Sequence, residues 1–189
     1  RDIKSGNILI DDEGNVMLAD FGVAAITRKP GPQSESNKSG NDEIVYTFAG
    51  TPCWMAPEVM KQSKGYSEKA DMWSLGITAL ELAKSYAPYA RERTMKVLLR
   101  TLQEDPPSLD TYSEYDDKGK TSKAFSSSFH RFYKRLLQKE PKKRPSAKDL
   151  LKDRFLTQTK DPKAVLKSKL LPFLRKLGPV ASNSTDNSA

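Results

Sequence analysis

The order of apolar and polar residues predicts a short β-hairpin followed by a series of helices. Residues 8–10 form an apolar run that reads as a buried strand, and residues 15–19 read as its antiparallel return. Between them, residues 11–15 combine acidic and amide side chains with a glycine that can adopt positive φ, which favours a tight reversal. A helix capped by Ser67 and running to about Lys84 is apolar on all sides, so we expect it to be buried.

Further along the chain, apolar residues recur at helical spacing. The side chains that we expect to face the core in these helices are Met95, Leu98, Leu99, Leu102, Phe129, Tyr133, Leu136, Leu137, Leu150 and Leu151. The helix that carries the last two begins at Pro145-Ser146, and the final helix begins at Asp161-Pro162 and ends at Gly178-Pro179. Residues 112–123 are polar and are predicted to form a loop.

Length and composition predict a domain with its own core. The chain has 189 residues, of which 37% are apolar. Its apolar runs are too short for a membrane span, and its single cysteine, Cys53, excludes an internal disulfide. Both features favour a cytoplasmic protein. A reactive thiol is one interpretation of Cys53, but a small side chain packed before Trp54 is the simpler one.

The net charge of +8 is unevenly distributed. Residues 118–177 hold 19 Lys and Arg against 4 Asp and Glu, whereas residues 1–117 hold 13 against 19. This asymmetry indicates either a docking face for acidic partners or nucleic acid, or the solvated faces of helices. No aromatic-interleaved motif accompanies the lysines, so we favour solvated faces and expect no nucleic-acid partner. His130, the only histidine, is expected to face solvent without a catalytic or ligand role.

The candidate chemistry lies at the base of the predicted hairpin. The hairpin brings Asn7, where its first strand begins, alongside Asp20, where its second strand ends. An amide oxygen and a carboxylate at one spot are hard ligands suited to Mg²⁺ that holds phosphate oxygens. Asp2 is then free to orient and deprotonate an attacking hydroxyl, and Lys4 supplies a positive charge for a transferring phosphoryl group.

Three ordered motifs resemble those of eukaryotic protein kinases. Arg1-Asp2-Ile3-Lys4-Ser5-Gly6-Asn7 resembles the catalytic loop, Asp20-Phe21-Gly22 the metal-binding loop, and Ala56-Pro57-Glu58 the end of the activation segment. The resemblance implies the C-terminal lobe of a protein-kinase-like fold, which is mainly α-helical with a small antiparallel β-hairpin at the catalytic loop. Gly22 would support the metal-binding loop structurally.

Within that family, the chain resembles the sterile-20-like serine/threonine kinases, most closely their oxidative-stress-responsive and Fray branch. Stretches such as Gly50 to Met55, Gly65 to Asp71 and Thr101 to Leu109 carry this resemblance, which departs around residues 28–43 and 112–123. It implies ATP and Mg²⁺ as cofactors, protein substrates phosphorylated on Ser or Thr, an upstream activating kinase, and a role in stress or ion-transport signalling. Lys4 also favours Ser/Thr specificity.

The resemblance also assigns regulatory residues. Residues 28–43 are rich in Gly, Pro, Ser and Asn and are expected to form a mobile activation loop. Thr47 stands where related kinases are phosphorylated, and Arg1 would pair with its phosphate. Tyr46 and Thr51 are competing hydroxyls, but Thr51 is expected to contact Asp2 and Lys4 and to position the substrate.

Three further residues are implied to support the site structurally. Glu58 would form a buried bidentate pair with Arg144. Asp71, on the buried helix, would accept hydrogen bonds from the catalytic-loop backbone. The implied division is a partial kinase domain over residues 1–156, a helical extension over residues 157–179 and a disordered tail over residues 180–189.

Two readings of a different class remain open: a pseudokinase scaffold, or a truncated lobe that only binds partners. The four candidate catalytic and metal-binding residues are intact, which favours an enzyme. The chain lacks a glycine-rich phosphate loop and the lysine that contacts the α- and β-phosphates. We therefore expect residues 1–189 alone to be inactive. The sequence leaves the oligomeric state and a separate C-terminal docking domain open.

Overall fold

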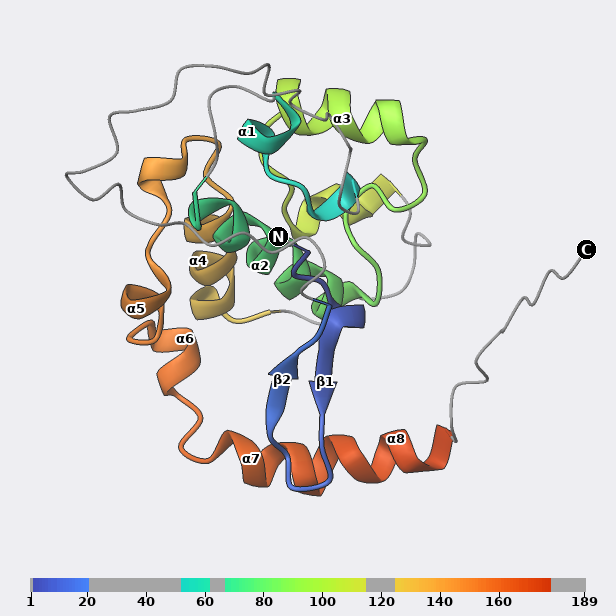
Figure 1. The fold of residues 1–189 in the computed structure, drawn as a ribbon, viewed down its shortest axis with the longest axis vertical. Coiled ribbons are helices and arrows are strands. Elements are labelled where there is room, and N and C mark those ends of the chain that lie inside the picture. Colours follow the sequence, from blue (N-terminus) through green and yellow to red (C-terminus); the bar gives the residue numbers. More distant parts are fainter. Residues whose placement is uncertain (1, 21–51, 62–66, 115–124, 178–189) are drawn as a thin grey trace, which may run out of the picture.

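The computed structural model describes residues 2–20, 52–61, 67–114 and 125–177. A hairpin of β1 (Ile8–Ile10) and β2 (Val16–Leu18) projects from a body of helices (Figure 1). The α-helices of the described residues are α1 (Pro57–Met60), α2 (Lys69–Lys84), α3 (Thr94–Gln103), α4 (Ser127–Leu136), α5 (Ala147–Leu150), α6 (Arg154–Thr157), α7 (Pro162–Val165) and α8 (Leu171–Leu177). Short 3₁₀ turns are η1 (Ser5–Asn7), η2 (Pro52–Trp54), η3 (Leu109–Glu114) and η4 (Pro141–Lys143).

The hairpin turn forms as its residues predict. The strands pair antiparallel, with Ile8 opposite Leu18, and Gly14 takes a φ of 76° in the turn. Asp11 accepts hydrogen bonds from the backbone and side-chain nitrogens of Asn15, both at 2.7 Å. These bonds, led by the side-chain one, hold the pKa of Asp11 below its ordinary value.

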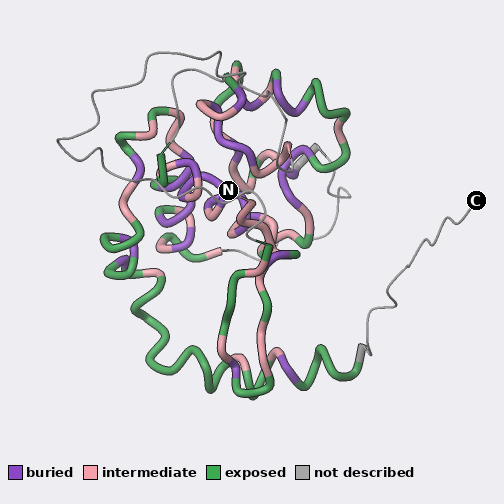
Figure 2. Tube along the Cα trace, in the orientation of Figure 1, coloured by how far each residue is buried: buried purple, intermediate pink, exposed green. Residues whose placement is uncertain are grey.

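The prediction that residues 8–10 form a buried strand is wrong, because Ile8 and Ile10 are only half-buried. Leu9 is 50% exposed, and all three residues of β2 are exposed. In the part of the chain that the structure describes, the sheet has only these two strands, and Figure 2 shows exposed and half-buried residues along them. A buried strand needs a layer that covers its face, and the described elements do not supply one for these apolar side chains.

The core lies where α2 packs against α4. The buried side chains at this junction are Trp73, Ile77, Leu80, Phe129, Phe132, Tyr133, Leu136 and Leu137. Gly76 permits the close approach, because a Cβ atom there would lie 2.8 Å from Leu137 Cδ2 and 2.9 Å from Leu136 Cβ. The predicted inward positions of α4 are thus confirmed, and the helix from Lys69 to Lys84 lies within two residues of its predicted start.

Several apolar side chains predicted to be buried face solvent instead. They are Leu82, Met95, Leu99 and Leu151, with exposed fractions of 68%, 67%, 49% and 72%. On α3 the buried side chains are Val97, Leu98 and Thr101, so the inward face is rotated from the predicted stripe. A helix buries only the positions that meet a neighbouring element, and an apolar residue outside that seam stays exposed.

The predicted polar loop of residues 112–123 begins with a core residue. Tyr112 is 1% exposed, lies in η3, and donates a hydrogen bond from its hydroxyl to the Tyr86 carbonyl at 2.9 Å. Its ring meets that of Tyr86 edge to face, with centroids 5.1 Å apart. The first residue of the predicted loop therefore lies in a 3₁₀ turn and packs into the core.

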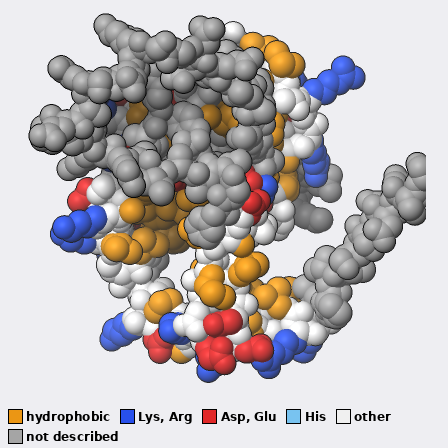
Figure 3. Space-filling model, viewed as in Figure 1, with side chains coloured by type: hydrophobic (Ala, Val, Ile, Leu, Met, Phe, Trp, Pro, Cys, Tyr) orange, Lys and Arg blue, Asp and Glu red, His pale blue; other side chains and the backbone are white. Residues whose placement is uncertain are grey.

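The last helix runs across the tip of the hairpin (Figure 1). It begins at Pro162, where Asp161 accepts a hydrogen bond from the Ala164 backbone at 3.0 Å, and a π-helical turn, η5 (Leu166–Leu170), joins α7 to α8. Arg175 pairs with Asp12 of the hairpin at 2.7 Å, and Figure 3 shows carboxylates gathered at this tip beside cations of the helix. None of the described helices is long and apolar enough to cross a membrane.

Candidate active site

Three of the predicted site residues contact one another at the base of the hairpin. Lys4 Nζ lies 2.7 Å from Asp2 Oδ2. The side-chain amide of Asn7 donates to the Asp2 backbone carbonyl at 2.8 Å and to Asp2 Oδ2 at 3.2 Å. Asn7 is 8% exposed, and the side chains of Asp2 and Lys4 are 10% and 26% exposed. The loop therefore holds a carboxylate, an ammonium group and an amide in a partly shielded cluster.

Asp20 directly follows Ala19, which pairs with Asn7 through the backbone. The Ala19 N–H donates to the Asn7 carbonyl at 2.8 Å, which extends the hairpin ladder to the start of the loop. Asp20 is exposed and takes a φ of 59°. The left-handed region is uncommon for a residue with a side chain, and such strained positions cluster at functional sites.

The chemistry of Asn7 and Asp20 suits a divalent ion that a nucleotide helps to hold. Both offer hard oxygen ligands of the kind that Mg²⁺ prefers. No group of three or more His, Cys, Asp or Glu side chains within the described residues could hold a metal ion. An ion held by Asn7 and Asp20 would need further oxygen ligands, such as those of phosphate groups and water.

Helix α2 holds the loop through two residues that sequence reasoning missed. Thr78 donates to the Ile3 carbonyl at 3.2 Å. Glu81 accepts from the Ser5 N–H at 3.0 Å and the Ser5 hydroxyl at 2.6 Å, and it also accepts from the Trp54 indole at 2.9 Å. These bonds tie the catalytic-loop segment and η2 to the same point on the buried helix.

A pattern in the sequence could have revealed these contacts. The polar residues Asp71, Ser74, Thr78 and Glu81 recur three or four positions apart within an otherwise apolar helix. That spacing places them on one face, and polar groups on a buried face need partners. Asp71 is half-buried in the first turn of α2, and its predicted bonds to the loop backbone stay a prediction.

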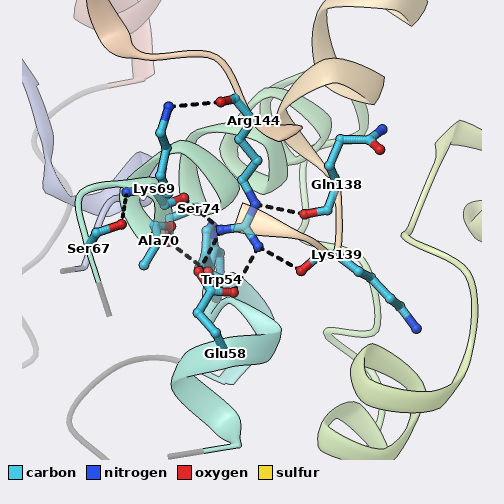
Figure 4. A network of polar contacts seen from close by, with 9 residues as sticks. All are labelled: Trp54, Glu58, Ser67, Lys69, Ala70, Ser74, Gln138, Lys139 and Arg144. Atoms are coloured by element: carbon cyan, nitrogen blue, oxygen red, sulfur yellow. Dashed lines mark hydrogen bonds and ion pairs between the residues drawn. The ribbon is translucent and has the colours of Figure 1, made fainter. Parts of the chain in front are cut away.

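The pair expected between Glu58 and Arg144 is present in the structure (Figure 4). The two guanidinium nitrogens donate to the two carboxylate oxygens at 2.7 and 2.8 Å. The guanidinium also donates to the backbone carbonyls of Gln138 and Lys69, each at 2.7 Å, and lies 5.2 Å from the Trp73 ring. The Arg144 side chain is 0% exposed. This network joins α1 and α2 to the segment from Gln138 to Arg144.

Four predicted site residues fall outside the described residues: Arg1, Gly22, Thr47 and Thr51. Cys53 is half-buried beside the core, and burial raises the pKa of its thiol, which agrees with a packing residue. His130 was expected to face solvent but is half-buried, and its Nδ1 lies 3.0 Å from the Tyr133 hydroxyl.

Comparison with known proteins places this arrangement in a family. Residues 1–156 match the protein kinase domain. The chain is 46% identical over 98% of its length to Germinal center kinase 3 of Caenorhabditis elegans, of which it covers 30%. It is 49% identical over 86% of its length to serine/threonine-protein kinase fray2 of Dictyostelium discoideum, of which it covers 14%.

The chain is also 46% identical over 82% of its length to serine/threonine-protein kinase ppk11 of Schizosaccharomyces pombe. It covers 43% of that relative, so it spans less than half the length of each of these proteins. The mainly helical fold with one small antiparallel hairpin agrees with these matches. The chain belongs to the protein kinase family, and within that family to the sterile-20-like kinases.

Proposed function

We propose that this chain forms part of a protein serine/threonine kinase that transfers the γ-phosphoryl group of ATP to Ser or Thr of protein substrates. The observation that carries the proposal is the contact of Asp2, Lys4 and Asn7 at the base of the hairpin, with Asp20 one residue beyond the pairing partner of Asn7. The kinase relatives support the same reaction.

In the proposed reaction, the substrate hydroxyl oxygen bonds to the γ-phosphorus while the bond from that phosphorus to the bridging oxygen breaks, which releases ADP. Asp2 orients the hydroxyl and accepts its proton. Asn7 restrains Asp2 through the 3.2 Å hydrogen bond to Oδ2, and Lys4 places positive charge beside the same carboxylate. Asn7 and Asp20 would hold Mg²⁺, which when bound offsets negative charge on the phosphates.

We further propose that phosphorylation of Thr47 by an upstream kinase activates the enzyme, with Arg1 pairing with the phosphate. Thr51 would position the substrate. A role in stress or ion-transport signalling in the cytoplasm is part of the same proposal and follows from the resemblance to the Fray branch. These assignments predict that Thr47→Ala blocks activation by an upstream kinase more strongly than Thr51→Ser does.

Radiolabelled phosphoryl transfer in a complete kinase domain that contains this chain tests the proposal. We expect label from [γ-³²P]ATP on Ser and Thr of a basic peptide, and loss of transfer in Asp2→Asn, which removes the base with little change in volume. Asp12→Asn, at the exposed hairpin tip, is the matched control and should keep wild-type turnover. Near-normal kcat in Asp2→Asn would refute the assignment, and an inactive wild type that still binds partners would favour a scaffold.

A further inference from the structure

The outward face of α4 forms a basic concavity that the proposed phosphoryl transfer does not use. Its volume is about 440 Å³, and its lining residues are His130, Arg131, Lys134, Arg135, Gln138 and Lys143. All but Lys143 lie on α4 or just beyond its end, and Lys143 comes from η4. The sequence showed an excess of cations in this half of the chain, and the structure gathers some of them around one hollow.

Helical periodicity explains why these cations lie together. The apolar side chains of α4, among them Phe132 and Leu136, are buried against the core. His130 and Lys134 are four residues apart, as are Arg131 and Arg135, so both pairs project from neighbouring rows on the opposite side of the helix. Arg131 and Lys134 are exposed, so their charged groups are open to a ligand.

Nearby carboxylates neutralise only part of this charge. Arg135 pairs with Asp153, which is 8% exposed, and Lys143 pairs with Glu140 at 3.0 Å, both being more than half exposed. Among the described residues, no carboxylate lies within ion-pair distance of Arg131 or Lys134. The concavity therefore presents two cations that no carboxylate of the described residues neutralises, and like charges that line one hollow favour an anion between them.

We infer that this concavity binds a small ligand that carries two or more phosphate groups, either free in solution or as the headgroup of a lipid. A guanidinium group such as that of Arg131 can donate two parallel hydrogen bonds to two oxygens of one phosphate. An ammonium group such as that of Lys134 adds a point charge. The volume is within the range of small-molecule sites, about 300–1,000 Å³.

The dimensions and lining disfavour nucleic acid as the ligand. Residues 130 to 138 of the helical stripe span about 12 Å at 1.5 Å per residue. That length is too short for the roughly 6–10 phosphate contacts typical of a duplex-binding protein. The imidazole of His130 is the only aromatic ring in the lining, and its Nδ1 already contacts Tyr133, so there is no platform on which successive bases would stack.

Titration calorimetry with inositol hexakisphosphate tests the inference in a complete kinase domain that contains this chain. The variant Arg131→Glu/Lys134→Glu should weaken binding by about tenfold or more at roughly 0.15 M salt, because repulsion replaces attraction. The matched control is Lys169→Glu/Lys176→Glu, which makes the same change of net charge at exposed positions of the last helix. The affinity of this control for the probe should stay within about twofold of wild type, since salt screens surface charges that lie away from the concavity.

A second arm uses vesicles of phosphatidylcholine with and without phosphatidylinositol 4,5-bisphosphate, in a sedimentation assay with the same variants. The inference is supported if Arg131→Glu/Lys134→Glu abolishes binding and the control variant keeps it. Binding to the soluble probe then identifies a free phosphate compound as the ligand, and binding to the phosphorylated vesicles alone identifies a lipid headgroup. Three results would overturn the inference. They are no binding to either phosphate probe, equal loss of binding in both variants, or, with a single-stranded oligonucleotide as a third probe, binding to the oligonucleotide alone. Circular dichroism confirms that the variants remain folded.

Discussion

The Glu58–Arg144 pair offers a stability prediction that the geometry makes quantitative. Glu58→Ala removes both acceptors at 2.7 and 2.8 Å and leaves a guanidinium whose side chain is 0% exposed without a counter-charge. Three backbone acceptors remain, from Gln138, Lys69 and, at 3.4 Å, Lys139. Breaking such a buried pair costs about 3–5 kcal/mol, a large part of the roughly 5–15 kcal/mol that stabilises a domain.

Urea unfolding followed by far-ultraviolet circular dichroism measures this cost. Tryptophan fluorescence is a poorer probe because the Arg144 guanidinium lies over the Trp73 ring. The control is Glu140→Ala, which breaks the neighbouring Lys143–Glu140 pair, whose side chains are 67% and 54% exposed. It should cost under about 1 kcal/mol, because exposed pairs contribute little.

A double variant separates a stranded charge from lost packing. Glu58→Ala/Arg144→Met removes the carboxylate and the guanidinium together, so it should be less destabilised than the sum of the two single variants by about 2–3 kcal/mol. The reasoning would be refuted if Glu58→Ala lowered the free energy of unfolding by less than about 1 kcal/mol. It would also be refuted if the destabilisation of the double variant equalled the sum of the two single variants.

Three further predictions concern other parts of the fold. Gly76→Ala should destabilise the domain by about 1–3 kcal/mol in urea unfolding through overpacking, whereas Gly6→Ala, with nothing within 4 Å of its Cβ position, should not. Cys53 should react slowly with a thiol reagent until urea unfolds the chain, because burial raises its pKa; equal rates would contradict this. Since hydrogen bonding lowers the folded-state pKa of Asp11, its stabilising contribution is present above the ordinary pKa and lost as pH falls through the lowered value. Asn15→Ala should raise that pKa in an NMR titration, and an unchanged value would contradict the assignment.

The elements that local chemistry determines could be predicted from the sequence. The turn at Gly14 needs positive φ, and Asp161-Pro162 combines a cap with a residue suited to the first helical turn. The sequence placed Asp2, Lys4 and Asn7 on one short loop before the first strand, and a single 3₁₀ turn does separate Lys4 from that strand; the contacts among the three side chains came from the structure.

Side-chain orientation within helices could not be predicted as well. An apolar stripe shows that a helix has an inward face, but it does not show which neighbour meets that face. Met95 and Leu99 therefore read as core residues although α3 meets the body through Val97 and Leu98. Glu81 was missed for a related reason, because its partners Ser5 and Trp54 lie far away in the sequence.

Binding of Mn²⁺, measured by electron paramagnetic resonance with and without ATP in a complete kinase domain, tests the central claim most directly. The claim is that Asn7 and Asp20 bind one divalent ion together with phosphate oxygens. We predict tight Mn²⁺ binding only with ATP, weakened about tenfold or more in Asn7→Ala and in Asp20→Ala and unchanged in Asp12→Asn. Wild-type Mn²⁺ affinity in Asp20→Ala would contradict the account.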